Sequence, residues 1–209
     1  MKVLLAHGSP DHRHGEQIKA LADTVSGLLD SEVGVAFLSD DALPLDATVL
    51  PLFLGEGKHV REDVPKLAAL SGCTMLPSLS EYADQIGELV VSEMTYETRR
   101  INAMFVLYRF AGFEQLAAAL YGRVKTCSKH AIASLHSEPS VSSVLKHWQG
   151  QGVTPVSLQP MLLFEGQSMD RLRRMTESFD KLSDISIAPV LSEYDGFAAL
   201  VANCFRNKP

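Results

Sequence analysis

The sequence predicts an α/β protein with two similar lobes, each a parallel sheet flanked by helices, that arose by internal duplication. Short runs of β-branched and other apolar residues alternate with longer amphipathic stretches, which is the pattern of a parallel sheet covered by helices. The string Leu-Ser-Glu-Tyr also occurs twice, at residues 79–82 and 191–194. We therefore expect an N-terminal α/β lobe over residues 1–98 and a C-terminal α/β lobe over residues 99–209.

The first half contains four runs of β-forming residues and three amphipathic stretches. These predict strands at residues 2–6, 33–38, 48–54 and 73–77, and helices at residues 14–30, 60–70 and 81–98. The second half repeats the pattern, with strands expected near residues 103–109, 130–135, 153–163 and 185–190, each followed by a helical pattern. No Gly/Ser-rich linker separates the halves, so we expect the lobes to pack closely.

Further segments align between the two halves. The segment "LPLFLGEGKHV" faces "QPMLLFEGQSM" at an offset of 109 residues, and "VAFLSDD" faces "IASLHSE" at an offset of 97. The first strand, "KVLLAHG", lies against "MFVLYRF", which places Arg109 opposite His7. The offset rises because the second half carries a helical segment, "PSVSSVLKHWQGQG", where the first half has the short "ALPLDAT".

A second register of the duplication is also compatible with the sequence. It places His136 opposite His7, since "SLHSEP" resembles "LAHGSP". Residues 97–128 would then be a helical insertion, and a continuous helix over residues 98–121 would favour this register. The first register instead predicts a strand around residues 103–108.

Composition restricts the class of protein. A chain of 209 residues suits one large core or two small fused halves. Its 46% hydrophobic and 21% charged residues are typical of a globular protein, and a formal net charge of −6 argues against nucleic acid as a partner. The three cysteines have no CxxC spacing, so we expect small buried side chains of a reducing compartment rather than a disulfide frame. They are Cys73, Cys127 and Cys204.

Neither the N-terminal segment nor the longest apolar stretch indicates a membrane protein. The first apolar run, in "MKVLLAHGSP", meets a His-Gly turn too soon for a signal peptide. The longest apolar stretch, "INAMFVLYRFAGFEQLAAALYG", is interrupted by Arg109 and Glu114, so it falls short of a membrane span. We therefore expect a cytoplasmic protein with no membrane partner.

Two histidines follow strands of the first lobe. His7 ends the first strand, and His59 lies just beyond the third, after Gly55 and Gly57, which we expect to turn the backbone. Ligands of parallel α/β sheets bind outside the carboxyl ends of the strands, so neighbouring strands would bring both imidazoles to one crevice. Such a pair can ligate a divalent metal and accept protons.

Polar and cationic residues accompany both histidines. The segment "HGSPDHRHG" adds Ser9 and Arg13, together with His12 and His14, and its Gly-Ser turn could present donors to an anion. The segment "GKHVRED" adds Lys58 and Arg61. An acidic protein that gathers cations beside candidate ligands is suited to holding carboxylates or phosphates.

The second half does not repeat this constellation. Arg109 stands opposite His7, Ser168 opposite His59, and His136 opposite Ser39, so we expect one asymmetric site. Two other histidines, His130 and His147, are interpreted as structural or exposed. The sequence contains no GxGxxG after the first strand, no GxxxxGK[ST], no GxSxG and no HExxH.

The first strand ending in "HGS", the segment "PLFLGEGKHVREDVP" and the two-lobed layout together resemble the sirohydrochlorin chelatases, the small class II cobaltochelatases and ferrochelatases. The resemblance implies insertion of cobalt or ferrous iron into sirohydrochlorin, with His7 and His59 as catalytic and metal-handling residues. The tetrapyrrole would lie between the lobes. The resemblance implies no organic or redox cofactor, because the divalent metal is a substrate, and a monomer is sufficient because both lobes belong to one chain.

Within that resemblance, five residues are candidates for binding the tetrapyrrole and its peripheral carboxylates, and His136 is a further candidate metal ligand. The five are Ser9, Arg13, Lys58, Arg61 and Arg109.

The sequence departs from the family pattern in two places. Family members often carry a Glu at the end of the second strand, where this chain has Ser39 followed by Asp40 and Asp41. Asp40 or His136 could substitute. The helix between the second and third strands of the first lobe is also expected to be missing. A carrier that binds a tetrapyrrole or a metal without catalysis is therefore an alternative. A periplasmic-type binding protein shares two lobes but would require an export signal.

Overall fold

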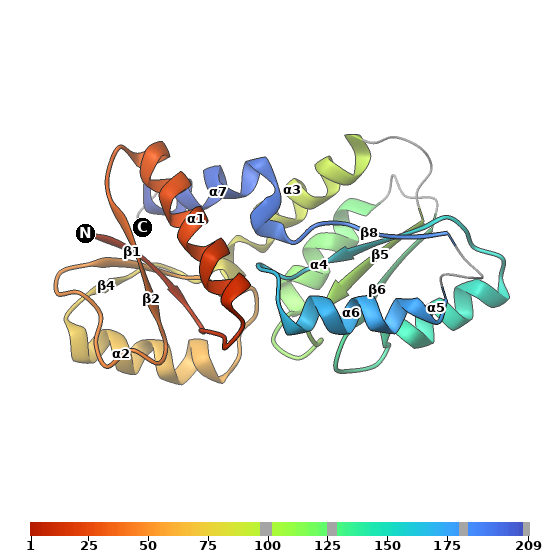
Figure 1. Cartoon of the computed structure of the whole chain (residues 1–209), viewed down its shortest axis with the longest axis horizontal. Helices are drawn as coiled ribbons and strands as arrows, with labels where there is room; N and C mark the ends of the chain where they lie inside the picture. The colour runs from red at the N-terminus through yellow and green to blue at the C-terminus, as the bar shows by residue number, and fades with distance from the viewer. Residues whose placement is uncertain (97–101, 125–128, 180–183, 207–209) are drawn as a thin grey trace.

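The computed structural model describes residues 1–96, 102–124, 129–179 and 184–206, and it contains two four-stranded parallel sheets side by side (Figure 1). The first has the order β2-β1-β3-β4 and the second the order β6-β5-β7-β8. Its strands are β1 (Lys2–Ala6), β2 (Val33–Phe37), β3 (Thr48–Pro51), β4 (Thr74–Met75), β5 (Asn102–Leu107), β6 (Lys129–Ser134), β7 (Val156–Pro160) and β8 (Ile185–Ile187). The predicted α/β fold of two similar lobes is confirmed.

Helices follow the strands in both lobes, except after β2 of the first lobe. Those of the first half are α1 (His12–Leu29), a π-helical turn η1 (His59–Asp63) that continues into α2 (Val64–Ser71), and a 3-10 turn η2 (Leu79–Tyr82) that continues into α3 (Ala83–Tyr96). Those of the second half are α4 (Glu114–Arg123), α5 (Val141–Gly150), α6 (Gln167–Glu177), the 3-10 turn η4 (Leu191–Glu193) and α7 (Asp195–Arg206). The two copies of Leu-Ser-Glu-Tyr therefore occupy equivalent places, each after the fourth strand of its sheet.

The pairing of the strands fixes the register of the duplication. Leu5 in β1 pairs with Ala36 and Pro51. Val106 in β5 pairs with Ala133 and Pro160. The predicted offsets of 97 and 109 are thereby confirmed for the second and third strands. Because β5 is a strand and α4 begins only at residue 114, the register that required a continuous helix over residues 98–121 is not supported.

The predicted alignment of the first strands is wrong by one residue. Since Val106 occupies the place of Leu5, the residue equivalent to His7 is Tyr108, not Arg109. The error has a physical cause. Central parallel strands are buried on both faces and read as continuous apolar runs, as the burial of β1 and β5 shows. Because apolar and polar residues do not alternate along such strands, shifting the alignment of two of them by one residue still matches apolar with apolar residues.

The two lobes differ between their second and third strands. In the second lobe α5 connects β6 to β7, whereas residues 38–47 form turns and no helix between β2 and β3. The expectation of a missing helix in the first lobe is confirmed.

The lobes exchange their last helices. The helix α3, which follows the first sheet, packs against α4 of the second lobe, and α7 packs against α1 and β3 of the first (Figure 1). One hydrophobic core consequently includes Leu4 and Leu50 of the first sheet, Phe105 of the second, and Phe197 of α7. The burial of these shared side chains holds the lobes together as well as each lobe itself. The expected division between residues 98 and 99 lies outside the described residues.

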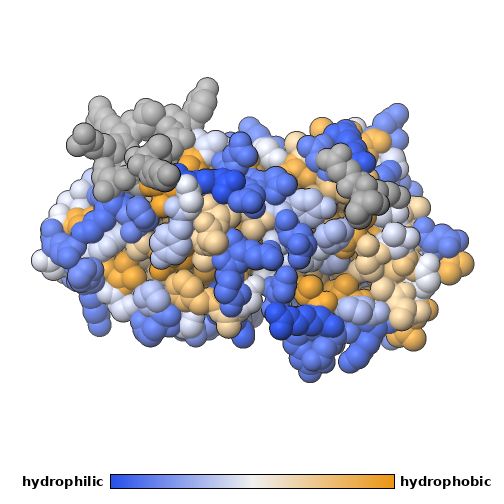
Figure 2. Space-filling model, turned by 180° about the vertical axis from the view of Figure 1, so that it is seen from behind, coloured by the Kyte–Doolittle hydropathy of each residue, from blue (hydrophilic) through white to orange (hydrophobic). Residues whose placement is uncertain are grey.

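Hydrophilic residues are spread over both lobes on the face shown in Figure 2. Within the described ranges, no helix combines the length and the apolar character needed to cross a membrane. Cys204 is buried and Cys73 is half-buried, as expected, while Cys127 lies outside the described residues.

Candidate active site between the two lobes

A cavity of about 570 Å³ lies where the carboxyl ends of the central strands of both sheets meet. Each of the strands β1, β3, β5 and β7 is followed by segments that line it, namely residues 6–9, 52–60, 108–113 and 161–168. This is the position in which parallel α/β sheets bind ligands. Because β1 and β3 are neighbours, the cavity receives both His7 and His59, as the spacing of the sequence predicts.

The two imidazoles face each other across this cavity. The Nε2 atoms of His7 and His59 are 3.1 Å apart, and the ring centroids are 4.4 Å apart with the planes at 78°. Both side chains are exposed to solvent. Gly8 follows with a φ of +87°, a left-handed conformation that lets the chain turn as it leaves β1.

The other ring nitrogens determine the tautomers. Nδ1 of His7 lies 2.9 Å from the carbonyl oxygen of Gly8, and Nδ1 of His59 lies 2.7 Å from Oδ2 of Asp63. Carbonyl and carboxylate oxygens only accept, so each Nδ1 must donate its hydrogen. In the neutral rings, both Nε2 atoms then carry a lone pair, and the two lone pairs face each other.

Two facing lone pairs repel each other unless a cation lies between them. A proton shared by the rings would be one such cation, and a divalent metal would be another. Metal–imidazole bonds of about 2.1 Å at a right angle would separate the two nitrogens by about 3.0 Å, close to the observed 3.1 Å. The separation of the two nitrogens therefore matches that of two adjacent ligands of one metal ion.

Asp63 orients His59. The π-helical turn η1 begins at His59 and ends at Asp63, which places the imidazole and the carboxylate one turn apart on the same face. The hydrogen bond from His59 lowers the pKa of Asp63. The carboxylate is thus kept charged, and it fixes the ring with Nε2 directed at His7.

We expect Asp63→Asn to weaken binding of Co²⁺ roughly 10- to 100-fold, because losing the carboxylate partner of a ligating histidine lowers its basicity and frees its tautomer. Titration with Co²⁺, followed by absorbance or calorimetry, measures the effect. Glu62→Gln is the matched control, since Glu62 is exposed on the same turn. Equal affinities for both variants would show that Asp63 does not position His59.

Contacts between the lobes hold the loop that carries His59. The amide of Glu56 donates to the carbonyl oxygen of Gly112 at 2.7 Å. A Cβ at Gly112 would lie 2.6 Å from the carbonyl oxygen of Glu56, and one at Gly55 would lie 2.4 Å from the ring of Phe113. Both positions require glycine because the backbone of one lobe lies too close to atoms of the other lobe to leave room for a side chain.

The expectation that Gly55 and Gly57 turn the backbone is confirmed: the chain bends at Gly55, and the amide of Gly57 donates to the carbonyl oxygen of Gly55 at 3.2 Å. Neither residue has a positive φ, and Gly57 has open space around it.

His14, which accompanies His7 in the sequence but is not among the predicted site residues, also lines the cavity. Its ring makes an edge contact with Phe164 of the second lobe, with centroids 5.1 Å apart. Burial, and then the nearby His7, lowers the pKa of His14, so its ring favours the neutral form. Its Nδ1 is buried without a hydrogen-bond partner in the part of the chain that the structure describes. Only the direction of α1 reveals that this histidine of "HGSPDHRHG" faces the cavity.

The structure separates the predicted substrate-binding residues into two groups. Ser9, Lys58 and Arg109 line the cavity, and Ser9 Oγ accepts from the amide of Asp11 at 3.2 Å. By contrast, Arg13 and Arg61 already have carboxylate partners within the chain.

Arg13 forms a link between the lobes. Its guanidinium lies 2.6 Å from Asp11 and 2.6 Å from Asp170 of α6. The hydrogen bond with Arg13 lowers the pKa of Asp11 to about 2, and the two carboxylates raise the pKa of Arg13. Arg61 lies 3.4 Å from Glu56. Both guanidinium groups therefore have acidic neighbours within the chain.

His136, the additional candidate ligand, does not join the histidine pair. It follows β6, its ring centroid is 4.5 Å from that of Tyr108, and it is not among the residues that line the cavity. Partial burial lowers its pKa, and so do the neighbouring cations Arg171 and Arg109. A site that already holds two cations is a poor place for a metal ion.

Other polar residues from the sequence have local roles or are exposed. Asp40 accepts from the amide of Phe37 at 2.9 Å and so closes the turn after β2. Ser168, the equivalent of His59, lines the cavity. His130 and His147 are exposed, as expected. No group of three or more His, Cys, Asp or Glu side chains suited to holding a metal occurs within residues 1–96, 102–124, 129–179 and 184–206.

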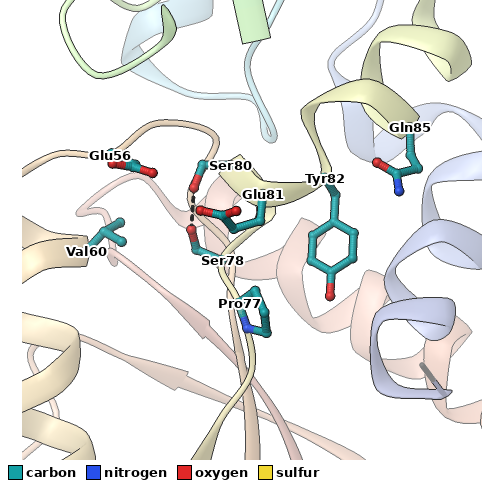
Figure 3. Close-up of a pocket in the computed structure, with 8 residues that line it drawn as sticks. All are labelled: Glu56, Val60, Pro77, Ser78, Ser80, Glu81, Tyr82 and Gln85. Atoms are coloured by element: carbon teal, nitrogen blue, oxygen red, sulfur yellow. Dashed lines mark hydrogen bonds between the residues drawn. The ribbon is translucent and has the colours of Figure 1, made fainter. Parts of the chain in front are cut away.

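A second cavity, of about 470 Å³, lies on another side of the same loop (Figure 3). Val60 lines both cavities, whereas Glu56 lines only the second, together with Glu81. The hydroxyls of Ser78 and Ser80 form a hydrogen bond of 2.6 Å there. No imidazole lines this cavity, so the histidine pair belongs to the first cavity.

Comparisons with known proteins agree with this architecture. A family model described as CbiX matches residues 2–91 and again residues 109–208. A structure described as CbiX, the terminal enzyme for biosynthesis of siroheme in denitrifying bacteria, is 17% identical, with a TM-score of 0.71, over 98% of this chain and 97% of that chain. SirB from Bacillus subtilis with Fe³⁺ is 16% identical, with a TM-score of 0.74, over 98% of this chain and 93% of that chain. No curated protein sequence matches.

Proposed function

The chain belongs to the CbiX family, and from this premise we propose that it is a sirohydrochlorin chelatase, a lyase that inserts cobalt or ferrous iron into sirohydrochlorin or a related tetrapyrrole in cobalamin or sirohaem biosynthesis. One observation supports this more than any other: the Nε2 lone pairs of His7 and His59 face each other at 3.1 Å in a cavity between two lobes. The descriptions of both structural relatives, one an enzyme of siroheme biosynthesis and one a structure with Fe³⁺, agree with it.

The pair supplies both functions that metal insertion requires. A divalent ion arriving from water exchanges water ligands for the two Nε2 atoms, and then exchanges these for the nitrogens of the ring. As the ion enters, two pyrrole N–H bonds break and their protons leave. An imidazole released by the metal is an acceptor within reach, and it passes its proton to water. One ion is consumed and two protons are released for each ring.

The lining of the cavity suits a flat macrocycle with a charged edge. Leu54, Phe113 and Met161 contribute apolar surface, while Lys58 and Arg109 contribute positive charge. Apolar side chains can cover the faces of the ring, and cations can pair with its carboxylates. Because both lobes of one chain complete the cavity, a monomer would suffice.

A carrier that binds a tetrapyrrole or a metal without catalysis is the second candidate. It is favoured by the end of β2, where Ser39 stands in place of a glutamate and Asp40 is hydrogen-bonded to the backbone. The histidine pair would still bind a metal in such a protein.

Turnover distinguishes the two functions. We expect that a mixture of protein, excess sirohydrochlorin and excess Co²⁺ will convert many equivalents of the tetrapyrrole, monitored by its absorbance, and faster than the same mixture without protein. Conversion that stops at one equivalent of protein would identify a carrier. Repeating the assay with Fe²⁺ under anaerobic conditions compares the two metals.

A further inference from the structure

The ends of the second lobe's central strands gather positive charge. Arg109 follows β5, His136 follows β6, and Arg171 lies on α6; we call these three residues the cationic cluster. Cζ of Arg109 lies 5.1 Å from the ring centroid of Tyr108, and that ring lies 4.5 Å from the ring of His136. All three side chains are exposed, and the charges of Arg171 and Arg109 contribute, after desolvation, to a lowered pKa of His136.

The cluster has no acidic counterpart in the described ranges. No ion pair is formed there by Arg109 or Arg171. Four other arginines do pair with carboxylates, namely Arg13, Arg61, Arg123 and Arg173. Arg109 and Arg171 thus differ from these four in having no carboxylate partner within the described ranges.

Gathering like charges costs free energy, and an anion bound among them recovers it. Guanidinium groups favour planar oxyanions because their N–H groups match the two oxygens of a carboxylate. Arg109 and Tyr108 line the same cavity as the histidine pair. An anion on the cluster can therefore belong to a molecule that also reaches His7 and His59.

We propose that Arg109, His136 and Arg171 bind a peripheral carboxylate of the tetrapyrrole and so fix the ring over the histidine pair. This inference rests on the proposed function and adds the residues that orient the substrate. The duplication explains the arrangement. Tyr108 occupies the place of His7, so the end of the first strand serves a metal ion in one lobe and, through the neighbouring Arg109, an anion in the other.

The cluster also reassigns a predicted residue. His136, considered above as a metal ligand, becomes a hydrogen-bond donor to the carboxylate, which both arginines attract to the same place. Arg109 keeps its predicted role of holding carboxylates and Arg171 is added to it, whereas the charges of Arg13 and Arg61 are already paired.

The test uses uroporphyrin, a metal-free porphyrin with carboxylates around its edge, as a fluorescent probe for the full chain. We expect Arg171→Gln and Arg109→Gln each to weaken its binding roughly tenfold, because each removes a charge-assisted contact. Arg174→Gln is the matched control, since Arg174 is exposed on the same helix and the substitution changes the net charge equally. The control should bind like the wild type.

A kinetic measurement distinguishes binding of the tetrapyrrole by the cationic cluster from a general effect of positive charge on the protein. For sirohydrochlorin and Co²⁺, the variants at residues 109 and 171 should raise KM roughly tenfold, and Arg174→Gln should leave it unchanged. Equal effects at residues 171 and 174, or no effect at residues 109 and 171, would overturn the cluster while leaving the chelatase function intact. Absence of turnover in the wild type would instead overturn the proposed function.

Competition with inorganic phosphate is the third measurement. If phosphate at millimolar concentration does not displace uroporphyrin from the wild type, the cluster recognises the carboxylate of a tetrapyrrole. Displacement that is lost in Arg171→Gln would show a general oxyanion site and would overturn the assignment to the tetrapyrrole.

Discussion

Replacing either His7 or His59 by Ala should lower the rate of metal insertion by more than about 10²-fold, the low end for loss of one general base. Each substitution removes a metal ligand and a proton acceptor together. The remaining imidazole then offers the ion one nitrogen where the pair offers two. The rate of Co²⁺ insertion into sirohydrochlorin, followed by absorbance, measures the loss. The same rate should fall as the solution is acidified, because protons compete with the metal for Nε2.

The controls for this prediction concern folding and specificity. Both rings are exposed, so the two variants should keep thermal stabilities near that of the wild type. His147→Ala changes an exposed histidine on α5 and should keep full activity. Folded His7→Ala and His59→Ala proteins that insert metal at the rate of the wild type would contradict the chelatase mechanism.

Gly112→Ala should lower the free energy of unfolding by about 3 kcal/mol and also slow metal insertion. Gly112 has a φ of +84°, and its new Cβ would lie 2.6 Å from the carbonyl oxygen of Glu56. The backbone cannot relieve this clash without moving the loop that leads to His59. Chemical denaturation and the insertion assay measure the two effects.

Gly152→Ala separates backbone strain from the contact between the lobes. Gly152 has a φ of +64° but no atom within 4 Å of a Cβ, so its substitution should cost only about 1 kcal/mol of strain and leave insertion unchanged. If both variants lose equal stability and both retain activity, the close approach of Gly112 to Glu56 does not position the site.

Much of the fold could be predicted because its signals are local. Apolar runs that alternate with amphipathic stretches specify parallel strands and their helices, and a duplicated string such as Leu-Ser-Glu-Tyr specifies equivalent places in two lobes. The limit of this reasoning lies in β1 and β5, which are buried on both faces. The sequence predicts their register wrongly by one residue and places Arg109 where Tyr108 stands.

The sequence by itself determined which strand ends carry His7 and His59, because a residue that follows a strand must lie at that edge of the sheet. Only the tertiary structure decided that their Nε2 atoms face each other at 3.1 Å. It likewise decided that Arg13 is paired with Asp170, a residue 157 positions away, and that Arg109 and Arg171 remain without such a partner in the described ranges. The physical reason is that strand ends follow from periodicity along the chain, whereas the pairing of charges depends on how two lobes, with exchanged terminal helices, pack against each other.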